Sequence, residues 1–174
     1  MKLRGKKGGN SIIPQNTTAD RSGSDIKRIL VPIDFSEHSK NALQYAISFA
    51  GKFNSELILV YVVEPTIYPA DFSFGQVAVP SIENELRERG KVELDNLVNA
   101  LIGESSTVKT IVRTGKPYLE IIKTAAEEDI DIIIIATHGH SGVEHLLFGG
   151  TTEKVVRKAP CPVLIVRPVE RSKE

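Results

Sequence analysis

A glycine-rich loop between an apolar segment and a predicted helix contains most of the residues that could bind a ligand. The segment IIIIATHGHSGVEHLLFGGTTEKVV runs from Ile132 to Val156 and includes four glycines and three of the four histidines of the chain. Glycine lets backbone amides approach a ligand closely and adopt positive φ. Gly149-Gly150-Thr151-Thr152 directly precedes the predicted helix, whose free amides and positive dipole end favour an anion. We therefore expect a phosphate site here.

Neighbouring residues extend this expectation from a phosphate to a nucleotide. Gly139 and Gly142 would let the turn after the apolar segment pass close to a phosphate. The hydroxyls of Thr151 and Thr152 add donors. Asp34 ends another apolar run, and its carboxylate could accept from a ribose hydroxyl or reach a Mg²⁺ ion. The competing interpretation is that the glycines only form turns and that Gly150 only caps a helix.

Other constellations that could do chemistry are weaker. Lys116 follows Gly115, but Pro117 stands where a P-loop needs Ser or Thr, so this is no phosphate loop of that type. His138, His140 and His145 do not have the i, i+4 spacing of a helical zinc pair, and no cysteine supports them. We predict that His138 faces phosphate and the other two face solvent. Cys161, between two prolines, is expected to be inert packing, and Glu144 to be an exposed charge.

Five apolar runs predict five strands. They span residues 26–34, 55–65, 107–115, 129–136 and 161–168. The second does not alternate with polar residues, so both of its faces should be covered. The third is more polar and is expected at a sheet edge, whereas the fourth is the most apolar and is placed centrally.

Helical patterns separate these strands. Ser36 is a candidate N-cap for the first helix, and Pro117 suits the first turn of the third. Ser81 is expected to cap the second helix after a loop over residues 66–80, and Gly90 should weaken that helix by about 1 kcal/mol relative to Ala. The residues expected to face inward are Ala42, Leu43, Ala46, Ala50 and Phe53 in the first helix, Leu86, Leu94, Leu97, Val98 and Leu101 in the second, Tyr118, Ile121, Ile122 and Ala125 in the third, and Val155, Val156 and Ala159 in the fourth.

This alternation of strand and helix predicts an α/β fold, with a five-stranded parallel sheet and helices on both faces. We favour the strand order 3-2-1-4-5. In that order the switch point lies between the first and fourth strands, and ligands bind beyond the carboxyl ends of the strands at such a point. The switch point brings Pro32–Asp34 beside Ala136–Gly139. The predicted phosphate loop should therefore open on the ligand-binding edge of the sheet.

Composition limits the class of protein. The 174 residues include 41% hydrophobic and 25% charged residues, with 22 basic and 22 acidic side chains. Zero net charge argues against a general nucleic-acid binder, and no apolar stretch reaches the length of a membrane span. A single cysteine fits a reducing compartment, so we expect the cytoplasm. Residues 1–25 are polar and basic and are expected to be a flexible tail, followed by one domain over residues 26–170.

Three segments, in order, resemble the universal stress protein family. VPIDFSEHSKNAL begins at Val31, the glycine-rich loop is similar to the family motif G-x2-G-x9-G-[ST], and APCPVLIVRP begins at Ala159. The resemblance covers about residues 26–168. It implies a Rossmann-like fold of the adenine nucleotide alpha hydrolase type, a homodimer, and ATP binding. ADP or AMP would fit the same site.

The resemblance also implies which residues form the site. Pro32, Ile33 and Asp34 would line the adenosine side, Val62 would contact adenine, and Ile135 and Ala136 would border base and ribose. The phosphates would be surrounded by His138, Gly139, Gly149, Gly150, Thr151 and Thr152. Two positions depart from the motif. Ala136 replaces its first glycine, and Gly150 replaces Ser or Thr, so that a hydroxyl is lost unless Thr151 or Thr152 substitutes.

Three functions remain open. The first is ATP binding as a regulatory signal in a stress response, with slow or no hydrolysis, reported by closure of the loop over residues 66–80. The second is a dimeric interaction module with a degenerate nucleotide pocket. The third is a slow ATPase or another enzyme that acts on nucleotides, which the absence of a visible general base disfavours. In each case the resemblance implies dimerisation by antiparallel pairing of the last strand, through Val163, Leu164, Ile165 and Val166.

Overall fold

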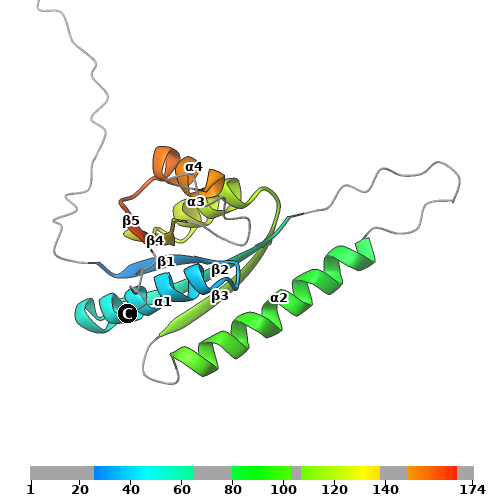
Figure 1. Ribbon diagram of the computed structural model, residues 1–174, viewed down its shortest axis with the longest axis horizontal. Coiled ribbons are helices and arrows are strands. Elements are labelled where there is room, and N and C mark those ends of the chain that lie inside the picture. The colour runs from blue at the N-terminus through cyan, green and yellow to red at the C-terminus, as the bar shows by residue number, and fades with distance from the viewer. Residues whose placement is uncertain (1–25, 65–79, 103–106, 138–148, 168–174) are drawn as a thin grey trace, which may run out of the picture.

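The computed structural model describes residues 26–64, 80–102, 107–137 and 149–167, which form an α/β fold around one parallel sheet (Figure 1). The sheet has five strands in the order β3-β2-β1-β4-β5. These strands are β1 (Arg28–Ile33), β2 (Glu56–Val63), β3 (Val108–Thr114), β4 (Ile132–Ala136) and β5 (Val163–Val166). All four pairings are parallel. The predicted fold class and strand order are confirmed, and each observed strand is one to three residues shorter than the apolar run at each end, except that β4 ends with its run at Ala136.

The burial of each strand follows its place in the sheet. β1, β2 and β4 are bordered on both sides and are mostly buried, whereas the residues of β3 and β5 are mostly half-buried. β3 is an edge strand, as its polar composition predicted. β1 is the middle strand, and β4 lies between β1 and β5. Interior parallel strands are apolar on both faces because helices cover both.

Two helices cover each face of the sheet (Figure 1). α1 (Glu37–Phe53) and α2 (Pro80–Leu101) pack one core cluster, to which they contribute Leu43 and Leu94. α3 (Pro117–Glu127) and α4 (Gly150–Lys158) pack the other, with Ile121 and Val155. Each helix connects two parallel strands, so its N-terminus follows the carboxyl end of a strand. No helix of the described segments is long and apolar enough to span a membrane.

The helix starts largely follow the sequence signals. Ser36 is the N-cap of α1 and accepts a hydrogen bond from the Ser39 amide. Pro117 occupies the first turn of α3, where its missing N–H has no consequence. The expectation for Ser81 was wrong, because α2 already begins at Pro80. The rest of the loop expected before this helix lies outside the described residues, as does the expected tail over residues 1–25.

Three apolar residues expected to face inward are exposed. Leu86 and Leu101 on α2 are 37% and 38% exposed, and Val156 on α4 is 44% exposed. α2 contacts the sheet mainly through its second half, where Leu94 and Leu97 are buried. α4 is only 9 residues long and directs Thr152 and Val155 to the core, so Val156 turns outward. A helix of this length buries only one narrow row of side chains against the sheet.

Gly90 has a packing role that the sequence did not reveal. It is buried in α2, and a Cβ there would lie 2.5 Å from Cδ1 and 2.6 Å from Cε1 of Tyr61 on β2. The Tyr61 ring packs on Phe35 with 4.8 Å between the centroids, which restricts its movement. Glycine at this position therefore lets α2 approach the sheet closely. Burial of Tyr61 in the same contact raises the pKa of its hydroxyl, and the Glu93 and Asp34 carboxylates raise it further.

Replacing Gly90 by alanine should lower the free energy of unfolding. The added methyl group overlaps the Tyr61 ring, and such overpacking costs about 1–3 kcal/mol, more than the roughly 1 kcal/mol that alanine gains in helix propensity. Gly51→Ala is the matched control, because a Cβ at this exposed position of α1 meets nothing within 4 Å. Urea unfolding of both variants checks the prediction, and Gly90→Ala matching Gly51→Ala in stability would contradict it.

Candidate functional site

A cavity of about 270 Å³ opens at the carboxyl edge of the sheet, where β1 and β4 diverge. It lies between the ends of β1, β2 and β4 and the first turns of α3 and α4. Its walls are formed by Pro32, Ile33, Asp34, Ser39, Val60, Val62, Glu64, Pro117, Ile121, Ile135, Ala136, Gly149, Gly150, Thr151 and Thr152. This is the switch point of the strand order, where ligands bind in sheets of this type.

Ten of the thirteen residues proposed from the sequence line this cavity. They are Pro32, Ile33, Asp34, Val62, Ile135, Ala136, Gly149, Gly150, Thr151 and Thr152. The other three, His138, Gly139 and Gly142, lie outside the described residues, as do His140, Glu144 and His145. The fold thus brings together residues that are more than 100 positions apart in the chain.

Five further lining residues were missed, although the fold accounts for them. Val60 is two positions before Val62 on β2 and shares its face, because side chains alternate along a strand. Pro117 and Ile121 are separated by one turn of α3. Ser39 belongs to the first turn of α1, and Glu64 directly follows β2. Helical and strand periodicity could have found the first three once the strand order was chosen.

The cavity has an apolar side and a polar side. Val60, Ile121 and Ile135 belong to the core cluster under α3 and α4, and Val62 packs against that cluster. This side suits a flat apolar group such as a nucleobase. Gly149, Gly150 and Thr151 supply backbone amides and a hydroxyl to the lining at the start of α4. The arrangement fits a ligand with a base at one end and an anion at the other.

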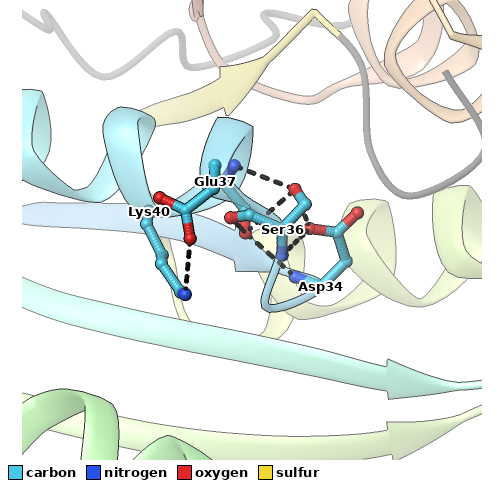
Figure 2. A network of polar contacts seen from close by, with 5 residues as sticks. Asp34, Ser36, Glu37 and Lys40 are labelled. Carbon is cyan, nitrogen blue, oxygen red and sulfur yellow. Dashed lines mark hydrogen bonds and ion pairs between the residues drawn. The ribbon is translucent and has the colours of Figure 1, made fainter.

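Asp34 is held at the end of β1 by the first turn of α1 (Figure 2). Its Oδ1 accepts hydrogen bonds from the Ser36 amide at 3.0 Å and the Ser36 hydroxyl at 2.6 Å. Ser39 donates its hydroxyl to the Ser36 carbonyl. On the exposed side of the same turn, the Lys40 ammonium lies 2.8 Å from Glu37 and holds the pKa of Glu37 below its usual value, by hydrogen bonding and by its charge. The Asp34 carboxylate is therefore fixed before any ligand binds.

The start of α4 presents backbone amides toward the cavity. The first hydrogen bond at this end of the helix runs from the Glu153 amide to the Gly149 carbonyl at 3.0 Å, so the amides of Gly150, Thr151 and Thr152 have no acceptor within the helix. The Gly149 amide instead donates to the Thr137 carbonyl at 2.8 Å. Three successive amides at a helix N-terminus favour an anion.

The two threonines of α4 differ in what their hydroxyls can do. The Thr152 hydroxyl is buried and donates to the Ala136 carbonyl at 2.9 Å, which ties α4 to the end of β4. Thr152 could therefore replace the hydroxyl lost at position 150 only by breaking this bond. Thr151 is half-buried and lines the cavity. Only Thr151 remains as the substitute that the sequence suggested.

We expect Thr152→Val to destabilise the fold by about 1–3 kcal/mol, because it removes the donor and leaves the buried Ala136 carbonyl without that bond. Valine keeps the shape of the side chain, so packing changes little. Thr151→Val makes the same chemical change at a half-buried position, where the hydroxyl has no such bond to the described residues. Thermal unfolding of the two variants should separate them, and equal melting temperatures would show that the Thr152 bond contributes nothing.

The charged groups of the cavity are acidic. Asp34 and Glu64 are the only ionisable residues among the described lining residues. No group of three or more His, Cys, Asp or Glu residues that could hold a metal ion occurs in the described segments. A Mg²⁺ ion at Asp34 would thus need the oxygens of a ligand to complete its coordination, since Mg²⁺ prefers six oxygen ligands.

Comparison with known proteins agrees with this architecture. A sequence model of the Universal stress protein family matches residues 25–167. Universal stress protein MJ0577 of Methanocaldococcus jannaschii is 33% identical over 153 residues, which are 81% of this chain and 94% of that protein. Its solved structure superposes with a TM-score of 0.72, at 34% identity, over 82% of this chain and 96% of that one.

Two further solved structures share the fold. Universal stress protein UspA from Lactobacillus plantarum is 26% identical, with a TM-score of 0.71 over 82% of this chain and 99% of that one. The universal stress protein from Archaeoglobus fulgidus, solved in complex with dAMP, is 20% identical, with a TM-score of 0.57 over 80% of this chain and 96% of that one. At that identity the last comparison extends to the fold alone.

Proposed function

Because the chain belongs to the universal stress protein family, we propose that its cavity binds ATP, with Mg²⁺, as a regulatory ligand in a stress response. The protein would act as a cytoplasmic homodimer that pairs through β5. The observation that carries the proposal is one cavity, at the switch point of the sheet, that joins apolar residues to a helix N-terminus whose first amides have no acceptor within the helix.

Each part of the nucleotide has a matching surface. The base would pack against Val60, Val62 and Ile135, which are apolar and close to the sheet. The ribose hydroxyls would donate to Asp34, whose position is fixed by Ser36. The phosphates would accept from the amides of Gly150 and Thr151. The dAMP complex of the Archaeoglobus fulgidus protein supports an adenine nucleotide as the ligand class for this fold.

Hydrolysis is proposed to be slow or absent. Phosphoryl transfer needs a positioned nucleophile and cations around the γ-phosphate. The described lining residues supply two carboxylates and no cation, and the Asp34 carboxylate already accepts two hydrogen bonds from Ser36. Phosphate release comparable with an ordinary ATPase, abolished by Gly149→Asp, would contradict this part of the proposal.

The second candidate is a dimeric interaction module with a degenerate nucleotide pocket. It is favoured by Gly150, which lacks the hydroxyl of the family motif, and by Thr152, whose hydroxyl is bound to Ala136. Denaturing the purified protein and separating the released small molecules by ion exchange distinguishes the two. We expect released adenine nucleotide, and saturating the native protein with ATP before gel filtration should increase it. No nucleotide under either condition would favour the interaction module.

A further inference from the structure

Lys154 on α4 and Tyr118 on α3 form a contact beside the phosphate end of the cavity. The Lys154 ammonium lies 4.8 Å from the centroid of the Tyr118 ring, and the Lys158 ammonium lies 5.7 Å from the same centroid. Tyr118 directly follows Pro117, which lines the cavity. A cation over a tyrosine face is held by the electrostatic field of the ring. Lys154 is therefore placed between the first turns of the two helices that border the cavity.

Lys154 lies on the face of α4 that also carries Gly150 and Thr151. A side chain on an α-helix points back toward the N-terminus and covers the residues three and four positions earlier. For Lys154 these are Thr151 and Gly150, and both line the cavity. A Cβ at Gly150 would meet nothing within 4 Å, so the space beside its backbone is open. The missing side chain at position 150 leaves room for the lysine chain.

The described lining residues include no cation near the start of α4, where the proposed ligand would carry its charge. The described lining residues include the carboxylates of Asp34 and Glu64 and no ammonium or guanidinium group. A triphosphate would add several negative charges to this acidic surface. The helix dipole offers only partial positive charge at its N-terminus. A flexible cation nearby would therefore increase the affinity of the cavity for a nucleotide with each phosphate that the nucleotide carries.

We infer that Lys154 is the phosphate-specificity residue of the cavity, moving from the Tyr118 ring to the β- and γ-phosphates of a bound nucleotide. This inference rests on the proposed function. It assigns to Lys154 the role that a hydroxyl at position 150 plays in the family motif, and it predicts that affinity rises from adenosine to AMP to ATP. The Tyr118 ring holds the ammonium close to the site while the cavity is empty.

Calorimetric titration of Lys154→Gln with adenosine, AMP and ATP tests the inference. Glutamine has a similar helix propensity and a polar end group, is one bond shorter than lysine, and removes the charge. We expect the dissociation constant for ATP to rise about tenfold, because a hydrogen bond to a charged group is lost. The constant for AMP should rise less and that for adenosine should not change. Lys154→Arg should bind ATP nearly as the natural protein does.

Two matched variants and salt provide the controls. Lys158→Gln removes the second cation from the Tyr118 ring but lies one turn farther from Gly150, and Lys116→Gln removes the charge at the N-cap of α3. Both should leave the affinity for ATP within about twofold. Raising the salt concentration should weaken ATP binding more for the natural protein than for Lys154→Gln, because screening acts on the charge that the variant lacks.

Three results would overturn the inference. Lys154→Gln could bind ATP as tightly as the natural protein does. It could lose adenosine and ATP affinity equally, which would indicate a structural role. Finally, Lys116→Gln could show the larger effect on ATP, which would place the cation on α3. If the natural protein bound no nucleotide at all, the proposed function would fail first and the inference with it.

Discussion

Gly150→Asp is expected to weaken ATP binding by at least about 100-fold while the fold stays as stable as the natural protein. The new carboxylate would stand at the first position of α4, where the phosphates are proposed to bind. Two like charges about 5 Å apart repel by roughly 3 kcal/mol at an effective dielectric constant of 20, which corresponds to this loss of affinity. Adenosine has no phosphate, so its affinity should change little.

The stability of this variant follows from the structure around Gly150. A Cβ at this position meets nothing within 4 Å, and Gly150 does not have positive φ, so a side chain fits without strain. An acidic residue in the first turn also interacts favourably with the helix dipole, by about 0.3–1 kcal/mol. A loss of ATP binding would thus reflect charge at the site and not unfolding.

Gly150→Ser is the opposite change at the same position. It restores the hydroxyl of the family motif, and because a hydrogen bond to a charged group contributes about 1.5–3 kcal/mol, ATP affinity should rise by about tenfold. Titration of both variants and of the natural protein with ATP and adenosine measures the series. Equal ATP affinity in all three proteins would show that the phosphates do not bind at the start of α4.

Ile165→Pro is expected to convert the proposed dimer into a monomer. In a parallel sheet, alternate residues of a strand direct their backbone N–H and C=O groups toward the same neighbouring strand. The carbonyls of Pro162 and Val166 accept from Ile133 and Thr137 on the β4 side, so Leu164 also faces β4 and the N–H of Ile165 points to the open edge of the sheet. Proline at position 165 would remove that donor and keep the pairing with β4.

Ile165→Val is the control, because it trims the side chain and keeps the N–H. Light scattering at micromolar concentration should give about twice the chain mass of 19.1 kDa for the natural protein and the valine variant, and the chain mass for the proline variant. A cooperative thermal transition must persist in each. If Ile165→Pro remained a folded dimer, pairing through β5 would be wrong, since the proline removes an outward donor near the centre of that strand and its ring obstructs the approach of a partner strand.

The sequence predicts the strand order well because the alternation of apolar runs with helical segments extends over most of the chain. Apolar runs such as those of β2 and β4 have no polar alternation, which requires helices on both faces and hence parallel connections. The handedness of such connections leaves few arrangements, and the polar β3 selects an edge. Ten of the residues proposed for the site line the cavity at the edge where β1 and β4 diverge, and this order defines that edge.

What the sequence misses depends on single contacts. Gly90 was interpreted as a weak point in a helix, whereas it admits the Tyr61 ring, a contact between residues 29 positions apart. Thr152 was expected to offer a hydroxyl, yet that hydroxyl binds the Ala136 carbonyl. Val156 has the apolar character of its neighbour Val155, and only the rotation of α4 on the sheet decides which one is buried. Periodicity identifies faces but does not determine such pairings.

The most direct test of the account is a calorimetric titration of the natural protein with ATP and Mg²⁺, after bound nucleotide has been removed by reversible unfolding and refolding. We predict one saturable site per chain, with a dissociation constant in the micromolar range, and competition by adenosine for that site. No heat of binding at millimolar ATP, from protein that has regained its cooperative thermal transition, would contradict nucleotide binding in the cavity between β1 and β4.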